Sequence, residues 1–149
     1  MAWDAEVLFK TCGSLDDVFT KTVTELQGYT ESGLEIHYVA GTISSDGDEY
    51  IERNIAELLR LQAVLTQQLG EKALVLTSPV IFTPAVYDRL KVFELPREER
   101  ELKFQNFWDK IITSGYMTGI HFAPKWERSI GTKLEHEAAT QQGIDIYYL

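Results

Sequence analysis

The segment from Trp126 to Glu135 brings together side chains that could act on a small anionic ligand. Ser129 and Gly131 stand at the expected start of a helix, where free backbone N–H groups and the helix dipole favour an anion. Arg128 adds a positive charge beside them. Glu135 follows one turn later, within reach of a sugar whose phosphate is held at the helix start. Its carboxylate could attack an electron-poor carbon and form a covalent intermediate, or it could serve only as an acid that stabilises the helix dipole.

A second segment of small residues, 41–47, follows the first predicted strand. Gly41, Thr42 and Ser44 could offer N–H groups and hydroxyls to a phosphate. The segment contains neither G-x-x-x-x-G-K-[ST] nor G-x-G-x-x-G, so an ordinary strand-to-helix turn is the alternative. Trp126 also has two interpretations, because its indole could plug the core or stack on a base.

The three histidines do not follow a metal-binding pattern. His136 lies between two glutamates, but neighbouring helical side chains point about 100° apart and no H-E-x-x-H pair exists. His37 and His121 lie inside predicted strands, where packing is the commoner role. We therefore expect neither a bound metal nor a cofactor.

Helices and strands alternate along the chain. Apolar periodicity predicts helices over Leu15–Leu26, Tyr50–Leu69, Arg97–Thr113 and Gly131–Gln142, and runs of β-forming residues predict strands over Glu35–Ala40, Ala73–Thr77, Tyr116–Phe122 and Ile144–Tyr148. Residues 78–96, which hold three of the four prolines, are expected to form an irregular, lid-like insertion with Phe82, Tyr87 and Phe93 packing or covering a site.

Short strand–helix–strand connections predict parallel strands with right-handed crossovers. The expected fold is an α/β, three-layer fold of the flavodoxin or Rossmann type, with a small parallel sheet of about four to five strands and helices on both faces. A site is expected where the loops after Ala40, Thr77 and Phe122 meet.

Composition limits the classes of function. With 149 residues, 44% of them hydrophobic, the chain fits one compact domain. A net charge of −9 disfavours binding to nucleic acid or to anionic membranes. The single Cys12, the lack of a signal pattern and the lack of an apolar run of about 20 residues favour a cytoplasmic setting. Residues 1–33 are expected to be an extension with one helix that serves packing or a dimer contact.

The run Trp126-x-x-Ser129-x-Gly131-Thr132-x-x-Glu135 resembles a motif of the nucleoside 2-deoxyribosyltransferase superfamily. Within that superfamily the chain is most similar to the nucleotide N-glycosidase branch and to related small bacterial and phage proteins. Residues 38–42 also look like the opening Y-x-A-G-P signature of the family. The resemblance covers residues 36–149 and places a domain of this type at residues 34–149.

The resemblance implies a role for each matching residue. Glu135 matches the glutamate that attacks C1′ and forms the glycosyl-enzyme intermediate. Ser129 replaces an aspartate of the transferases that act on free nucleosides, and it resembles the serine that binds a 5′-phosphate together with the loop of Gly41, Thr42 and Ser44. The family also has an aspartate on the preceding helix that assists at the base or sugar, for which Asp109 is the candidate.

The resulting hypothesis is a hydrolase that cleaves the N-glycosidic bond of a nucleoside or deoxynucleoside 5′-monophosphate, without a cofactor and as a homodimer or higher homo-oligomer. One alternative is base exchange between deoxynucleosides. The other is a non-catalytic nucleotide-binding module, suggested by Glu137, which stands where the family usually has glycine, and by the end of the chain at Leu149.

Overall fold

The computed structural model describes residues 3–149, apart from the side chain of Phe93. Its centre is a parallel sheet with the strand order β2-β1-β3-β4. The strands are β1 (Glu35–Ala40), β2 (Ala73–Thr77), β3 (Gly119–Phe122) and β4 (Asp145–Tyr148). Helices pack on both faces of this sheet, so the predicted α/β fold with a small parallel sheet is confirmed.

The helices occupy most of the remaining chain. The α-helices are α1 (Ala5–Leu8), α2 (Leu15–Glu31), α3 (Ile51–Leu69), α4 (Ser78–Ile81), α5 (Pro84–Leu90), α6 (Arg97–Ile112) and α7 (Ile130–Gln142). Short 3-10 helices lie in the connections: η1 (Asp48–Tyr50), η2 (Gly70–Lys72), η3 (Val92–Glu94) and η4 (Trp126–Arg128). Each predicted helix and strand is present, with its ends shifted by a few residues at most sites.

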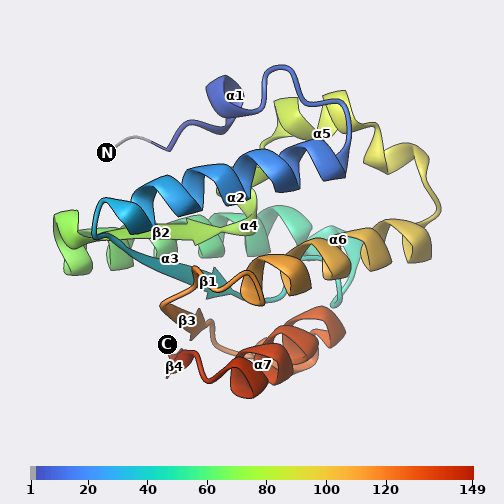
Figure 1. The fold of residues 1–149 in the computed structure, drawn as a ribbon. Coiled ribbons are helices and arrows are strands. Elements are labelled where there is room, and N and C mark those ends of the chain that lie inside the picture. The colour runs from blue at the N-terminus through green and yellow to red at the C-terminus, as the bar shows by residue number, and fades with distance from the viewer. Residues whose placement is uncertain (1–2) are drawn as a thin grey trace.

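The alternation of side chains along β1 explains how the helices divide between the two faces. Ile36 and Tyr38 belong to the larger apolar cluster, which α2, α6 and α7 cover. Val39 belongs to a smaller cluster beneath α3. Figure 1 shows α2, α6 and α7 in front of the sheet and α3 behind it.

The N-terminal residues share the main core instead of forming a separate unit. Phe9, Val18 and Leu26 are fully buried in the same cluster as the central strands. Helix α2 continues past its predicted end at Leu26 as far as Glu31, because the chain turns only at Gly33, where φ is +86°.

Residues 78–96 are not irregular, and the prediction of a lid-like insertion is wrong. They form α4, α5 and η3, and two prolines occupy the first turns of α4 and α5, where a missing N–H leaves no helical bond unmade. Phe82 is buried against the aromatic rings of α6. The prolines therefore start helices here, and Phe82 and Tyr87 pack in or against the core, while the predicted role of Phe93 lies outside the described side chains.

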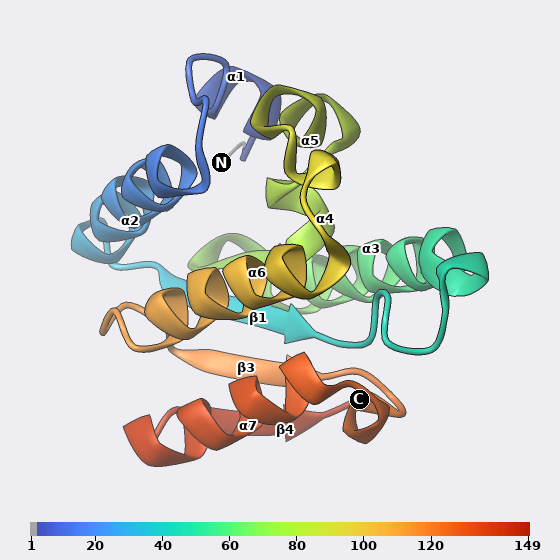
Figure 2. The ribbon, with the colours of Figure 1, turned by 90° about the vertical axis from the view of Figure 1, so that its right-hand side faces the viewer.

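The sheet has a switch point between its two central strands. From β1 the chain crosses over through α3 to β2, whereas from β3 it crosses through α7 to β4 on the opposite side. The loops after β1 and β3 therefore diverge at the carboxyl edge of the sheet, which all the strands face in Figure 2. Open parallel sheets bind ligands in the crevice formed at such a point.

Candidate functional site

A cavity of about 510 Å³ opens at this switch point, which is a size typical of sites for small molecules. Its walls come from the loop after β1, from the first three turns of α6 and from the start of α7. Ser78, directly after β2, also lines it. The loops after β1, β2 and β3 thus converge on one cavity.

Glu135 lies in the wall of this cavity and has an unusual environment. Its Oε2 atom is buried and has no hydrogen-bond partner among the residues that the structure describes. Burial raises the pKa of the Glu135 carboxyl to about 8, and a hydrogen bond from the Tyr38 hydroxyl partly opposes that rise. A carboxyl group in a cleft whose pKa is raised by burial, and which has one oxygen without a partner, is characteristic of functional sites.

Tyr38 comes from β1 and approaches Glu135 from the floor of the cavity. Its ring stacks on Trp108 of α6, with centroids 4.2 Å apart and an angle of 10° between the planes. Burial, and then the nearby Glu135, raise the pKa of the Tyr38 hydroxyl well above its usual value. Tyr38 is therefore a neutral donor, fixed in position to hydrogen bond with the carboxyl group.

The start of α7 presents polar groups to the same cavity. Ser129 is the N-cap, and its Oγ accepts a hydrogen bond from the backbone N–H of Thr132 at 3.2 Å. Ser45, from the loop after β1, donates to the same oxygen at 3.4 Å. Arg128 lines the cavity beside them and forms no ion pair with any residue between 3 and 149. Two loops far apart in sequence therefore meet where an anion would be stabilised.

The loop after β1 contributes unequally to the cavity. Gly41 and Ser44 line it, whereas Thr42 does not, and the Thr42 hydroxyl is buried without a partner among the described residues. A Cβ atom on Gly41 would lie 2.8 Å from the side chain of Leu58 and 3.0 Å from that of Ala123. The absence of a side chain at Gly41 is thus required for close packing against α3, whatever ligand the loop binds.

The first turns of α6 place positively and negatively charged side chains along the cavity. Arg97 donates to the backbone carbonyl of Ser44 at 3.0 Å and to the Glu101 carboxylate at 2.9 Å. Arg100 and Glu98 also line the cavity. The bond from Arg97 ties α6 to the loop after β1 and so closes one side of the site.

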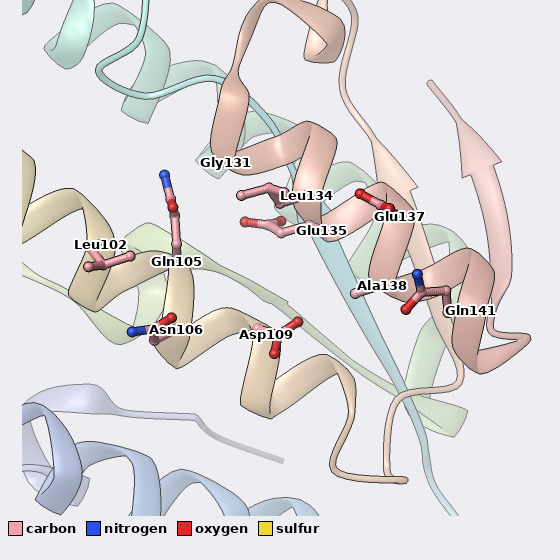
Figure 3. A pocket seen from close by; sticks show the side chains of 10 residues that line it. All are labelled: Leu102, Gln105, Asn106, Asp109, Gly131, Leu134, Glu135, Glu137, Ala138 and Gln141. Carbon is pink, nitrogen blue, oxygen red and sulfur yellow. The ribbon is translucent and has the colours of Figure 1, made fainter.

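A separate groove of about 290 Å³ runs between α6 and α7 and contains Asp109 (Figure 3). The cavity therefore does not contain Asp109, although Glu135 lines both spaces. Helical geometry explains this position: Trp108 faces the cavity, and the next residue points about 100° away. The acids of α6 that do face the cavity are Glu98 and Glu101.

Trp126 lies outside both spaces. Its indole stacks on the His136 ring, with centroids 4.4 Å apart, and contacts the ring of Phe122. His136 Nε2 is 2.7 Å from the Tyr148 hydroxyl. The predicted binding of substrate by Trp126 is therefore not supported by its position, which matches the interpretation as an aromatic plug.

His37 and His121 lie on the opposite face of the sheet from Glu135, with Nδ1 of the first 2.8 Å from Nε2 of the second. Burial, and then the nearby His37, lower the pKa of His121 to about 4. Within residues 3–149 no group of three or more His, Cys, Asp or Glu side chains is arranged to hold a metal ion.

Sequence reasoning did not identify several residues of the cavity. Tyr38 belongs to the motif of the first strand, but nothing in the sequence pairs it with a glutamate 97 positions later. Ser45 and the two arginines of α6 reach the site only through the packing of loops and helices. Side-chain alternation in β1 was the one available signal, since it turns Tyr38 to the same face as α7.

Comparison of this chain with models of protein families, with curated proteins and with solved structures found no match.

Proposed function

We propose that this protein is an N-glycosidase that cleaves the bond between base and sugar in a nucleoside or deoxynucleoside 5′-monophosphate. The observation that carries the proposal is the partly buried carboxyl group of Glu135, whose Oε2 atom has no partner among the described residues, in a cavity at the switch point of a parallel sheet. The resemblance of residues 126–135 to a nucleotide N-glycosidase motif supports the same assignment.

In the proposed reaction the ionised Glu135 carboxylate attacks C1′ of the sugar. The bond between C1′ and the base nitrogen breaks, and the base leaves with the bonding electrons and takes up a proton. Asp109, in the adjoining groove, is the acid available to supply that proton. A water molecule then attacks C1′ and gives a proton to the Asp109 carboxylate, its oxygen becomes the new hydroxyl of the sugar, and Glu135 is released as a carboxylate.

The polar groups at the start of α7 suit a 5′-phosphate. Ser45, Arg128 and Ser129 line the cavity, and the first turn of a helix carries N–H groups without helical partners that favour an anion. Ser129 lies six residues before Glu135, which corresponds to about 9 Å along the helix axis. This separation leaves room for the sugar between a phosphate at the helix start and C1′ beside the carboxyl group.

We also propose a homodimer in the cytoplasm. Leu102, Ile130 and Leu134 are at least 47% exposed and flank the mouth of the site, so a second copy could cover them. Between residues 3 and 149 no helix is both long and apolar enough to cross a membrane. Light scattering at several protein concentrations measures the oligomeric state, and a monomer throughout contradicts this part of the proposal.

The experiment is a panel of ribonucleoside and deoxyribonucleoside 5′-monophosphates, with free base measured by chromatography. We expect the wild-type protein to release base and Glu135→Gln to lose at least about a thousandfold in rate. Glu127→Gln is the matched control, because this exposed residue lines neither space. Release of base that survives Glu135→Gln contradicts the mechanism.

The same panel separates the alternatives. Addition of a second free base yields a new nucleoside or nucleotide if the protein catalyses base exchange. Tight binding by calorimetry with no release over hours indicates a binding module, which the raised pKa of Glu135 would favour, since a protonated carboxyl group is not a nucleophile.

A further inference from the structure

The groove between α6 and α7 has polar walls whose side chains make no bonds with one another. Within the described part of the chain, no side-chain hydrogen bond or ion pair satisfies any of the following five groove residues: Gln105, Asn106, Asp109, Glu137 and Gln141. Leu102, Leu134 and Ala138 supply apolar surface between them. Figure 3 shows that these side chains come from the two helices that border the groove. Apolar surface between polar side chains could bind a planar ligand whose edge carries hydrogen-bonding groups.

The groove and the cavity are joined at one point. Gln105, Gly131 and Glu135 line both spaces. A Cβ atom on Gly131 would lie 3.6 Å from the Gln105 side chain, so a glycine there keeps the two helices close without closing the connection. The carboxyl group of Glu135 is therefore accessible from two spaces with different chemistry.

The order of the two spaces along α7 matches the order of parts in a nucleotide. On α7, Ser129 faces the cavity, Glu135 faces both spaces, and Ala138 and Gln141 face only the groove. Phosphate, sugar and base follow one another in the same way along a nucleoside monophosphate. On α6 the two spaces instead lie side by side, because Leu102, Asn106 and Asp109 line only the groove, whereas Phe104 and Trp108 line only the cavity.

Charge fixes which end of the ligand enters which space. Arg97, Arg100 and Arg128 line the cavity, whereas the groove residues include no lysine or arginine and carry the acids Asp109 and Glu137. A phosphate would be repelled from the groove. A base with an exocyclic amino group would be attracted, because a carboxylate accepts from such a group and an amide can pair with it and the neighbouring ring nitrogen.

We propose that the α6–α7 groove binds the base of the substrate and that it selects amino-bearing bases, adenine and cytosine, over bases with a carbonyl at the same position. Glu137 accepts from the amino group, and Asn106 pairs with the edge beside it. This inference rests on the proposed function for the identity of the ligand, but the residues to which it assigns base recognition, Glu137 and Asn106, take no part in breaking the bond.

The test compares pairs of nucleotides that differ only in this group: dCMP with dUMP, and AMP with IMP. We expect kcat/KM to be about tenfold or more higher for the amino member of each pair. Glu137→Gln and Asn106→Ala should reduce that ratio severalfold, mainly through KM, while Glu99→Gln, an exposed acid on α6 outside both spaces, should leave it unchanged. Equal rates within both pairs, or a ratio that neither groove variant alters, overturn the inference.

Calorimetry with Glu135→Gln separates this inference from the proposed function. Tighter binding of dCMP than of dUMP, lost in the double variant with Glu137→Gln, supports the base site even if the wild-type protein hydrolyses neither. Hydrolysis that needs Glu135 but shows no preference for amino-bearing bases supports the function and contradicts the base site. Absence of binding to all four nucleotides contradicts both.

Discussion

The cavity at the switch point and the groove between α6 and α7 share Glu135, yet their walls differ in charge and in hydrogen bonding. In the cavity, Arg97 donates to the Ser44 carbonyl, and the Ser129 hydroxyl bonds to the Thr132 N–H and to Ser45. In the groove, the side chains of Gln105, Asn106, Asp109, Glu137 and Gln141 bond to nothing within the described part of the chain. The cavity is thus organised before a ligand arrives, whereas the groove has unused bonding capacity.

The two acids of α7 show what this difference means for one residue type. Glu135 and Glu137 are two positions apart, and both line the groove. Only Glu135 also faces the cavity, where its Oε2 atom is buried, while Glu137 is exposed. Burial without a partner destabilises a charged carboxylate and favours its protonated form. The position of each acid therefore decides which one could act as a nucleophile.

The largest expected effect is on stability and tests the burial of Glu135. Because the folded-state pKa is raised from 4.5 to about 8, the carboxyl group lowers stability as pH rises through this window. Glu135→Gln removes the titration and should stabilise the fold by on the order of 3 kcal/mol at pH 7, since one pKa unit corresponds to about 1.4 kcal/mol. Urea unfolding at pH 4 and at pH 8 measures the difference.

Glu137→Gln is the matched control for that measurement. The residue is exposed, so its substitution should change stability by less than about 0.5 kcal/mol at either pH. If both variants change the free energy of unfolding equally, or if Glu135→Gln increases it by the same amount at pH 4 and at pH 8, the inference that burial destabilises the charged form of Glu135 alone is wrong.

The second effect tests the anion-binding character of the cavity. Ser129→Asp keeps a good N-cap but places a carboxylate beside a bound phosphate. We expect kcat/KM for nucleoside monophosphates to fall about 100-fold, with a smaller loss for the free nucleosides, because like charges at close range repel strongly. Ser129→Asn preserves the cap without the charge and should retain most activity. Equal losses in the two variants would place the phosphate elsewhere.

The third effect is the pH dependence of the reaction. The nucleophile must be ionised, so kcat/KM should rise about tenfold between pH 7 and pH 9 and level off above the pKa of Glu135, near 8. Nucleotide phosphates are already mostly doubly charged above pH 7, since their second pKa is about 6, so the rise reports the enzyme. A profile that is flat over this range contradicts a raised pKa in the free enzyme.

The smallest effect concerns Tyr38. Its hydrogen bond stabilises the ionised carboxylate, so Tyr38→Phe should raise the pKa of Glu135 further and lower kcat/KM at pH 7 by a few fold. The loss should shrink at pH 9, where the group ionises in both proteins. Tyr147→Phe, on the opposite face of the sheet, is the control and should leave the profile unchanged. A pH-independent loss would indicate that Tyr38 acts through packing alone.

The sequence alone determined the fold class and the order of its elements. Continuous runs of β-forming residues located β1 and β2 to the residue, because buried parallel strands are short, continuous and flanked by clear turn signals. The sequence also located Ser129 at the start of a helix, where the structure shows it as the N-cap. The sequence misjudged residues 78–96, because proline starts a helix as readily as it breaks one, and only the surrounding packing decides which.

Only the tertiary structure decided which side chains meet. The burial of Glu135, its contact with Tyr38 and the separation of Asp109 from the cavity all depend on how α6 and α7 pack on β1. A shift of one residue on a helix turns a side chain by about 100°, so spacing in the sequence could not assign Asp109 to the cavity or to the groove. Local sequence patterns determine helices and strands, because the interactions that form them involve residues close together in the sequence. A site at the edge of a sheet instead forms from loops that are far apart in the sequence.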